Sequence, residues 1–256
     1  MATQNNIDLG RQRVRVFRYN QGQWNVDTDL EFAWGQPFAS IGEYALDLDD
    51  ERIVGAAIEA DSNHYNHGVA QVFERNQSGE WLPASTPLPD PNEDRLSEFG
   101  ATVAIDGDTI AVSAPSVFNQ GSRYQNGYVV VYERNETSAW VEKQTLSSGK
   151  KDGFGNSLAL VGNRLVVGAP EGGSVYIYER SASNQWNLAS TIEAQGFGFG
   201  RSVSLDGNLL AVGQVSGGAK GNTFLYEQQG GEWVPAGELV NDLVSNKAQA
   251  GEPVIL

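Results

Sequence analysis

One phrase recurs five times along the 256-residue chain, and it constrains the fold more than any other feature. Each copy is an alternating apolar segment, a polar turn and a tryptophan that opens the next segment: VRVFRYNQGQW (14–24), AQVFERNQSGEW (70–81), VVVYERNETSAW (129–140), VYIYERSASNQW (175–186) and TFLYEQQGGEW (223–233). The tryptophans are 57, 59, 46 and 47 residues apart. Because a propeller blade takes roughly 40–50 residues in four strands, this spacing predicts repeated blades with insertions in the first two units.

A second phrase precedes four of the tryptophan phrases. Its copies are IGEYALDLDDERIVGAA (41–57), FGATVAIDGDTIAVSAP (99–115), FGNSLALVGNRLVVGAP (154–170) and FGRSVSLDGNLLAVGQV (199–215). Each reads as strand, tight turn, strand, because Asp106-Gly107, Gly162-Asn163 and Asp206-Gly207 accept the positive φ that such turns require. The sequence therefore predicts a unit of strands a and b from this phrase, followed by strands c and d from the tryptophan phrase.

The best copies of the unit are Phe99-Gly100 with Ala114-Pro115, and Phe154-Gly155 with Gly168-Ala169-Pro170. With these phrases the chain resembles, over nearly its whole length, the FG-GAP repeat family of β-propellers, which includes the head of integrin α-subunits. Many repeats of that family hold calcium in an Asp-x-Asp-x-Asp-Gly loop between strands a and b. Here those turns are too short to wrap an ion, and the nearest acidic segment, 47–51, lacks the glycine. We therefore expect no metal, no cofactor and no cation-dependent adhesion.

We expect one all-β domain over residues 1–256, a propeller of about five four-stranded blades. The predicted continuous blades are 38–88, 99–146, 154–192 and 199–240, and a composite closing blade joins 14–32 to 243–256. The closing segment LVSNKAQAGEPVIL aligns without gaps to 99–112, and a ring closed in this way favours a monomer. A fragment of a larger ring and a ring completed by a second copy are the alternatives.

Composition excludes several classes of partner and site. The chain has 17 Lys and Arg against 32 Asp and Glu, a net charge of −15, which argues against nucleic acid because phosphate binding needs a basic surface. There is no cysteine, so disulfides and cysteine nucleophiles are excluded. No segment approaches 18 apolar residues, so we expect no membrane span. We expect an extracellular or cell-surface location, with a cytoplasmic one as the alternative.

The connections predict which face of the propeller binds. The a–b and c–d turns are short and uniform, whereas the b–c and d–a connections vary widely, as expected of a binding surface on a regular scaffold. Candidate binding residues on that face are Trp34, Asp61, His64, Tyr65, His67, Phe118, Arg123 and Tyr124. Trp34 could stack on a sugar or pack under a loop. His64 and His67 with Asp61 offer too few ligands for a metal site.

No catalytic motif is present: the sequence lacks a Gly-x-Ser-x-Gly elbow, a phosphate loop and a His-Glu-x-x-His helix. Strand a supplies mainly Ser, Thr, Ala and Val toward the axis. We therefore expect a non-catalytic interaction module or scaffold that binds a protein or glycan ligand. A lectin-like propeller is the first alternative. A glycoside hydrolase or lyase, which would need two facing carboxylates in a central pocket, is the second.

Overall fold

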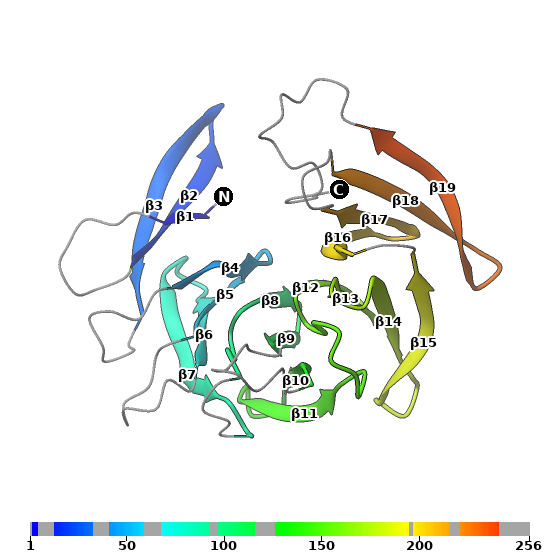
Figure 1. The fold of residues 1–256 in the computed structure, drawn as a ribbon. Coiled ribbons are helices and arrows are strands. Elements are labelled where there is room, and N and C mark those ends of the chain that lie inside the picture. The colour runs from blue at the N-terminus through cyan, green and yellow to red at the C-terminus, as the bar shows by residue number, and fades with distance from the viewer. Residues whose placement is uncertain are drawn as a thin grey trace.

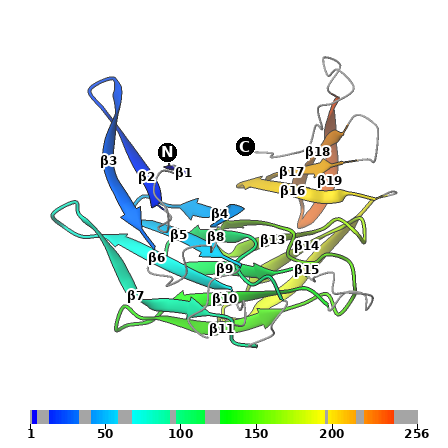
Figure 2. The same ribbon diagram turned by 60° about the vertical axis from the view of Figure 1, so that its left-hand side comes forward.

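The computed structural model of the chain describes residues 2–4, 13–32, 41–58, 68–92, 97–115, 126–194, 197–215 and 221–240. All described elements are β-strands, in five antiparallel sheets that follow one another around a common axis (Figures 1 and 2). The predicted β-propeller is confirmed. The described part of the chain contains no helix that could cross a membrane.

We number the sheets as blades in chain order. Blade 1 holds β1 (Ala2–Gln4), β2 (Arg13–Asn20) and β3 (Gln23–Glu31). Blade 2 holds β4 (Ile41–Leu48), β5 (Arg52–Ala57), β6 (Val69–Arg75) and β7 (Trp81–Pro89). Blade 3 holds β8 (Val103–Asp106), β9 (Thr109–Ala114), β10 (Tyr128–Arg134) and β11 (Trp140–Leu146). Blade 4 holds β12 (Ser157–Val161), β13 (Arg164–Ala169), β14 (Ser174–Arg180) and β15 (Trp186–Glu193). Blade 5 holds β16 (Phe199–Asp206), β17 (Leu209–Gln214), β18 (Asn222–Gln229) and β19 (Glu232–Val240).

Strands β4, β8, β12 and β16 lie innermost, because each blade is a simple meander that starts at the axis (Figure 1). Segment 243–256 of the predicted composite blade lies outside the described residues, so its pairing with 14–32 stays a prediction. Strand β2 pairs with β3 along one edge and with β1 along the other, where Ala2 lies opposite Val16.

The repeated Phe-Gly packs against the blade before it. The phenylalanines are fully buried, and the glycines that follow have φ of 91° at Gly100, 95° at Gly155 and 87° at Gly200. A Cβ on Gly100 would lie 2.9 Å from the Cβ of Ala56, in the small-residue segment that ends strand b of blade 2. Small residues at both positions therefore let the backbones of consecutive blades approach closely. The positive φ at the Phe-Gly glycine is a second constraint, because residues with a Cβ rarely adopt it.

Gly127→Ala is expected to lower the free energy of unfolding by about 1–3 kcal/mol, the usual cost of overpacking. Its new Cβ would collide with the carbonyl oxygen of Phe154, a backbone atom of the next blade that cannot turn away. Gly237→Ala in β19 is the matched control, since a Cβ there meets nothing within 4 Å, and should change stability by less than about 0.5 kcal/mol. Urea unfolding of both variants tests this, and equal losses would contradict it.

The described residues form four apolar core clusters, each shared by two consecutive blades. Every cluster contains the last large apolar residue of strand d from one blade and the repeat tryptophan that opens strand d of the next. The four pairs are Leu30 with Trp81, Leu88 with Trp140, Leu146 with Trp186, and Ile192 with Trp233. The repeat tryptophan is therefore a residue of the junction between blades.

Candidate active site

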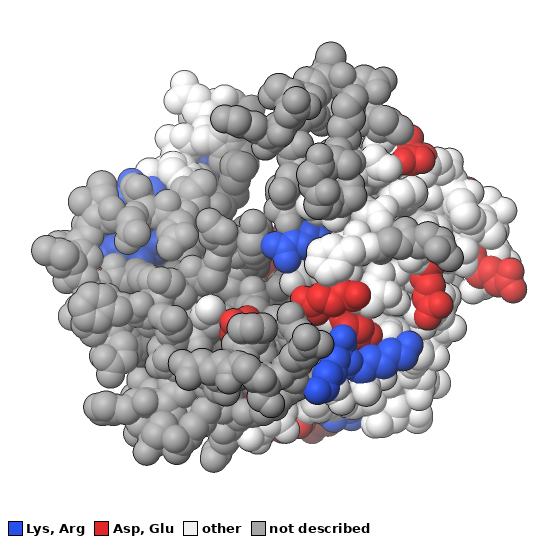
Figure 3. All heavy atoms as spheres, in the orientation of Figure 1, with Lys and Arg blue, Asp and Glu red and all other residues white. Residues whose placement is uncertain are grey.

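A pocket of about 540 Å³ runs along the axis between the inner strands. Its lining residues come from β4, β8, β12 and β16, from the turns that precede β8 and β12, and from the residue after β9: Leu46, Asp47, Glu98, Ala101–Ala104, Pro115, Asn156–Val161 and Arg201–Leu205. Acidic and basic side chains gather near the centre of the face viewed along this axis (Figure 3). The inner strands therefore enclose a ligand-sized space.

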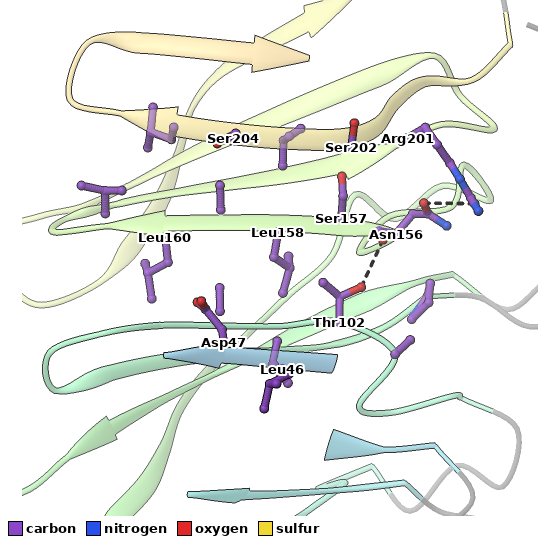
Figure 4. Close-up of a pocket in the computed structure, with 18 of the residues that line it drawn as sticks. Leu46, Asp47, Thr102, Asn156, Ser157, Leu158, Leu160, Arg201, Ser202 and Ser204 are labelled. Atoms are coloured by element: carbon purple, nitrogen blue, oxygen red, sulfur yellow. Dashed lines mark hydrogen bonds between the residues drawn. The ribbon is translucent and has the colours of Figure 1, made fainter. Parts of the chain in front are cut away.

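The polar end of the pocket is formed where the inner strands begin. Asn156 and Arg201 each directly follow a Phe-Gly pair, so the repeat places them at equivalent positions on neighbouring blades. One guanidinium nitrogen of Arg201 donates to Oδ1 of Asn156 at 3.3 Å (Figure 4). Because strand a follows the d–a connection, this end belongs to the face with variable loops.

The hydroxyls beside them hold the blades together. Thr102 donates to the carbonyl oxygen of Asn156 at 3.1 Å (Figure 4), and Ser157 donates to the carbonyl oxygen of Gly200 at 2.9 Å. Each bond joins one inner strand to the following blade. With their protons held by backbone carbonyls, these hydroxyls are poor candidates for nucleophiles.

Asp47 lies toward the other end of the pocket, beside Leu160 (Figure 4). Its Oδ2 accepts the backbone N–H of Ile105 at 2.8 Å, and its Oδ1 accepts the N–H of Leu48 at 2.9 Å. Burial raises the pKa of Asp47, and the two backbone donors oppose that shift. Both oxygens are occupied, so this carboxylate joins blade 2 to blade 3.

The acidic segment 47–51, the nearest approach to a calcium loop, is used in the same way. Asp49 accepts the N–H of Gly107 at 3.0 Å through Oδ2 and the N–H of Arg52 at 2.7 Å through Oδ1. Within the ranges that the structure describes, no three His, Asp or Glu side chains gather as metal ligands. The carboxylates of Asp47 and Asp49 therefore satisfy the backbone of the neighbouring blade.

Glu98 is the other carboxylate that lines the pocket, and its backbone is strained. The turn that opens strand a is the same in blades 3 to 5, where an N–H donates to the carbonyl three residues earlier: Ala101 to Glu98 at 3.0 Å, Asn156 to Gly153 at 3.1 Å and Arg201 to Gly198 at 3.2 Å. Gly153 and Gly198 have φ of 75° and 89°, and Glu98 has φ of 52°. Glutamate thus stands where the repeat otherwise places glycine, at a cost of about 1–3 kcal/mol.

The carboxyl of Glu98 is half-buried, and burial raises its pKa above the ordinary glutamate range. No described residue donates a hydrogen bond to it or forms an ion pair with it. A pocket carboxylate that has a raised pKa and no partner in the described part of the chain fits a general base.

The residues on either side of Glu98 are held rigidly. Ser97 donates to the buried Asp90 at 2.8 Å and accepts the N–H of Phe99 at 3.2 Å, while the Tyr128 hydroxyl donates to Asp90 at 2.6 Å. Burial, and then the bond to Asp90, raise the pKa of Tyr128, which therefore stays protonated as a donor. This network fixes the turn that carries Glu98.

The eight binding residues predicted from the sequence, Trp34, Asp61, His64, Tyr65, His67, Phe118, Arg123 and Tyr124, all lie outside the described residues. Their role stays a prediction. Sequence reasoning missed Glu98, Asn156 and Arg201, because it considered only the small side chains that strand a directs toward the axis. A signal was available: the residue before Phe-Gly is glycine at 153 and 198 but glutamate at 98.

The fold resembles that of solved propellers. A protein of unknown function from Desulfotomaculum acetoxidans DSM 771 matches with a TM-score of 0.60 at 14% identity, over 91% of this chain and 64% of that one. The periplasmic gluconolactonase of Pseudomonas aeruginosa matches with a TM-score of 0.59 at 14% identity, over 90% and 64%. A candidate 6-phosphogluconolactonase of Bacteroides fragilis NCTC 9343 matches with a TM-score of 0.56 at 14% identity, over 90% and 65%.

This chain therefore spans 64–65% of the length of these structures. No protein-family model and no curated protein matches it.

The expectation of a non-catalytic interaction module, and with it the prediction that the chain is not an enzyme, is wrong: two of these propellers bear the names of lactonases. The physical reason lies in the pocket. The expectation considered only the small side chains within strand a, whereas Glu98 precedes Phe-Gly, and Asn156 and Arg201 follow it, at the polar end. Nothing in these similarities supports adhesion or lectin activity.

Proposed function

We propose that this chain is a hydrolase that opens cyclic esters, and that Glu98 is its general base. One observation carries the proposal: a carboxylate with a raised pKa and no partner among the described residues occupies a glycine position of the repeat and lines the axial pocket. Strain of this kind persists at functional sites, where the surrounding structure enforces it. The lactonase names of two similar propellers support this reaction class.

The pocket residues divide the reaction between them. Glu98 takes a proton from a water molecule, whose oxygen forms a bond to the carbonyl carbon of the lactone. Negative charge develops on the carbonyl oxygen, and the Arg201 guanidinium and the Asn156 amide supply donors for it at the same end of the pocket. The ring C–O bond then breaks, and the leaving oxygen takes the proton back from Glu98. The product is an open-chain hydroxy acid.

The pH dependence of hydrolysis tests this assignment. Only the ionised form of Glu98 can take a proton, so kcat/KM should fall as pH falls through its pKa. Because burial raises that pKa, the fall should begin at a higher pH than for an ordinary glutamate. A pH-stat assay on a panel of aldonolactones and simple aliphatic lactones measures it. Failure to hydrolyse any lactone above the uncatalysed rate would contradict the proposal.

We also propose that the chain belongs to the FG-GAP family and that it is located outside the cytoplasm. Membership of the FG-GAP family is supported by the four Phe-Gly or Ile-Gly phrases in register with the tryptophan phrases. A location outside the cytoplasm is supported by the periplasmic gluconolactonase that shares the fold.

A further inference from the structure

Two apolar residues at repeat positions that are covered in other blades are exposed at opposite ends of the arc. Trp24 opens strand d of blade 1 and is 58% exposed, whereas Trp140 and Trp186 at the same repeat position are 6% and 2% exposed. Leu239 lies near the end of strand d of blade 5 and is 58% exposed, whereas its equivalent Leu146 is 4% exposed. The register confirms the equivalence, since Leu146 pairs with Val129 and Leu239 with Thr223, both at the start of strand c.

Leu239 and Trp24 occupy the two repeat positions that belong to one apolar cluster at each described junction. At each of the four junctions within the chain, a strand-d leucine or isoleucine of one blade packs in the same cluster as the tryptophan of the next. Blade 5 presents the leucine half through Leu239, and blade 1 presents the tryptophan half through Trp24. The surface around Trp24 is therefore shaped for the trailing side of a blade like blade 5.

Polar groups at the junctions agree with this pairing. The residue opposite the tryptophan across strands c and d is arginine in blades 3 and 4, and it bonds a glutamate of the blade before: Arg134 to Glu74 at 3.0 Å and Arg180 to Glu133 at 3.2 Å. In blade 1 this position holds Tyr19, which is exposed and packs against Trp24 with the two rings tilted and their centroids 5.2 Å apart. In blade 5 the glutamate position holds the exposed Glu227.

We propose that copies of this chain associate head to tail, with the outer strands β18 and β19 of one copy, through Glu227 and Leu239, covering Tyr19 and Trp24 of the next. A second copy is the occupant because a single chain leaves both halves exposed, with blades 1 and 5 standing apart at the two ends of the arc (Figures 1 and 2). The contact joins two different surfaces, so it is heterologous and can propagate beyond a dimer. Tyr19 supplies a hydroxyl donor for Glu227.

Light scattering after size-exclusion chromatography, across a micromolar-to-millimolar concentration series, tests this. The mass of the wild-type chain should rise to at least twice that of one copy, and Trp24→Glu or Leu239→Glu alone should abolish the rise. Mixing the two variants is the decisive experiment, because Trp24→Glu keeps the surface around Leu239 and Leu239→Glu keeps the surface around Trp24. The mixture should form a one-to-one dimer and grow no further.

A wild-type chain that stays monomeric at every concentration would overturn the proposal. This holds whether the fluorescence of Trp24 then indicates a ring exposed to solvent or a ring covered within its own chain. Association that survives in either single variant would overturn it as well. Circular dichroism and thermal unfolding confirm that both variants fold, as expected of exposed positions. The proposed lactonase activity depends on the pocket, so its presence or absence does not affect this result.

Discussion

Replacing Glu98 by glutamine is expected to lower kcat/KM for lactone hydrolysis by about 10²–10⁴-fold, the usual contribution of a positioned general base. Glutamine keeps the size of the side chain and its left-handed backbone but cannot take a proton from water. The fold should be unaffected, because no described residue bonds the carboxylate. Initial rates at saturating and limiting lactone, measured above the pKa of Glu98, give the comparison.

Glu98→Gly should change activity and stability in opposite directions: activity is lost and the free energy of unfolding rises. Glycine occupies the same turn at 153 and 198, so this variant relieves the strained φ and should be about 1 kcal/mol more stable than the wild type while losing the lactonase activity. Glu232→Gln, on the exposed strand β19, is the control and should change neither quantity. Wild-type rates in Glu98→Gln, or a loss of stability in Glu98→Gly, would contradict the account.

Trp186→Ala should lower the free energy of unfolding by about 3–5 kcal/mol, as for other buried aromatic residues. The side chain lies in the cluster between blades 3 and 4, and its backbone is fixed by Gln144, which accepts its N–H at 2.9 Å and donates to its carbonyl at 2.9 Å. The cavity would open at the junction of two blades, where neither sheet can close it alone.

Trp24→Ala is the matched control, since it changes the same repeat residue at a position where the side chain is exposed. Measured by chemical denaturation at a dilution where the chain is monomeric, it should cost less than about 0.5 kcal/mol. Equal losses in the two variants would show that the tryptophan stabilises its own sheet rather than the junction.

The repeat made the blades predictable, because alternating apolar residues indicate the strands of each unit and glycines indicate its turns. The tight turn after strand a is a clear case: Gly107, Gly162 and Gly207 have φ of 56°, 58° and 55°, as the Asp-Gly and Gly-Asn pairs predict. What the repeat cannot show is which neighbour covers an element. Trp24 and Trp186 are equivalent in the sequence, and only the arrangement of the blades makes one exposed and the other buried.

The candidate site was harder to predict, for a related reason. The candidate general base departs from the repeat, whereas the repeat is identified from the positions that match. Glu98 lies just before the Phe-Gly pair and outside the repeated phrase, so it was not among the candidate residues, although its two equivalents are glycines. Asp47 and Asp49 were assessed as calcium ligands, whereas the neighbouring blade supplies backbone N–H groups that use the same oxygens.

A titration of the Glu98 carboxyl by carbon-detected NMR tests the central claim most directly, with the signal assigned by its loss in Glu98→Gln. We predict a pKa above the ordinary glutamate range that coincides with the midpoint of the kcat/KM profile for lactone hydrolysis. A Glu98 pKa in the ordinary range, or a kcat/KM midpoint that persists in Glu98→Gln, would contradict its role as the general base.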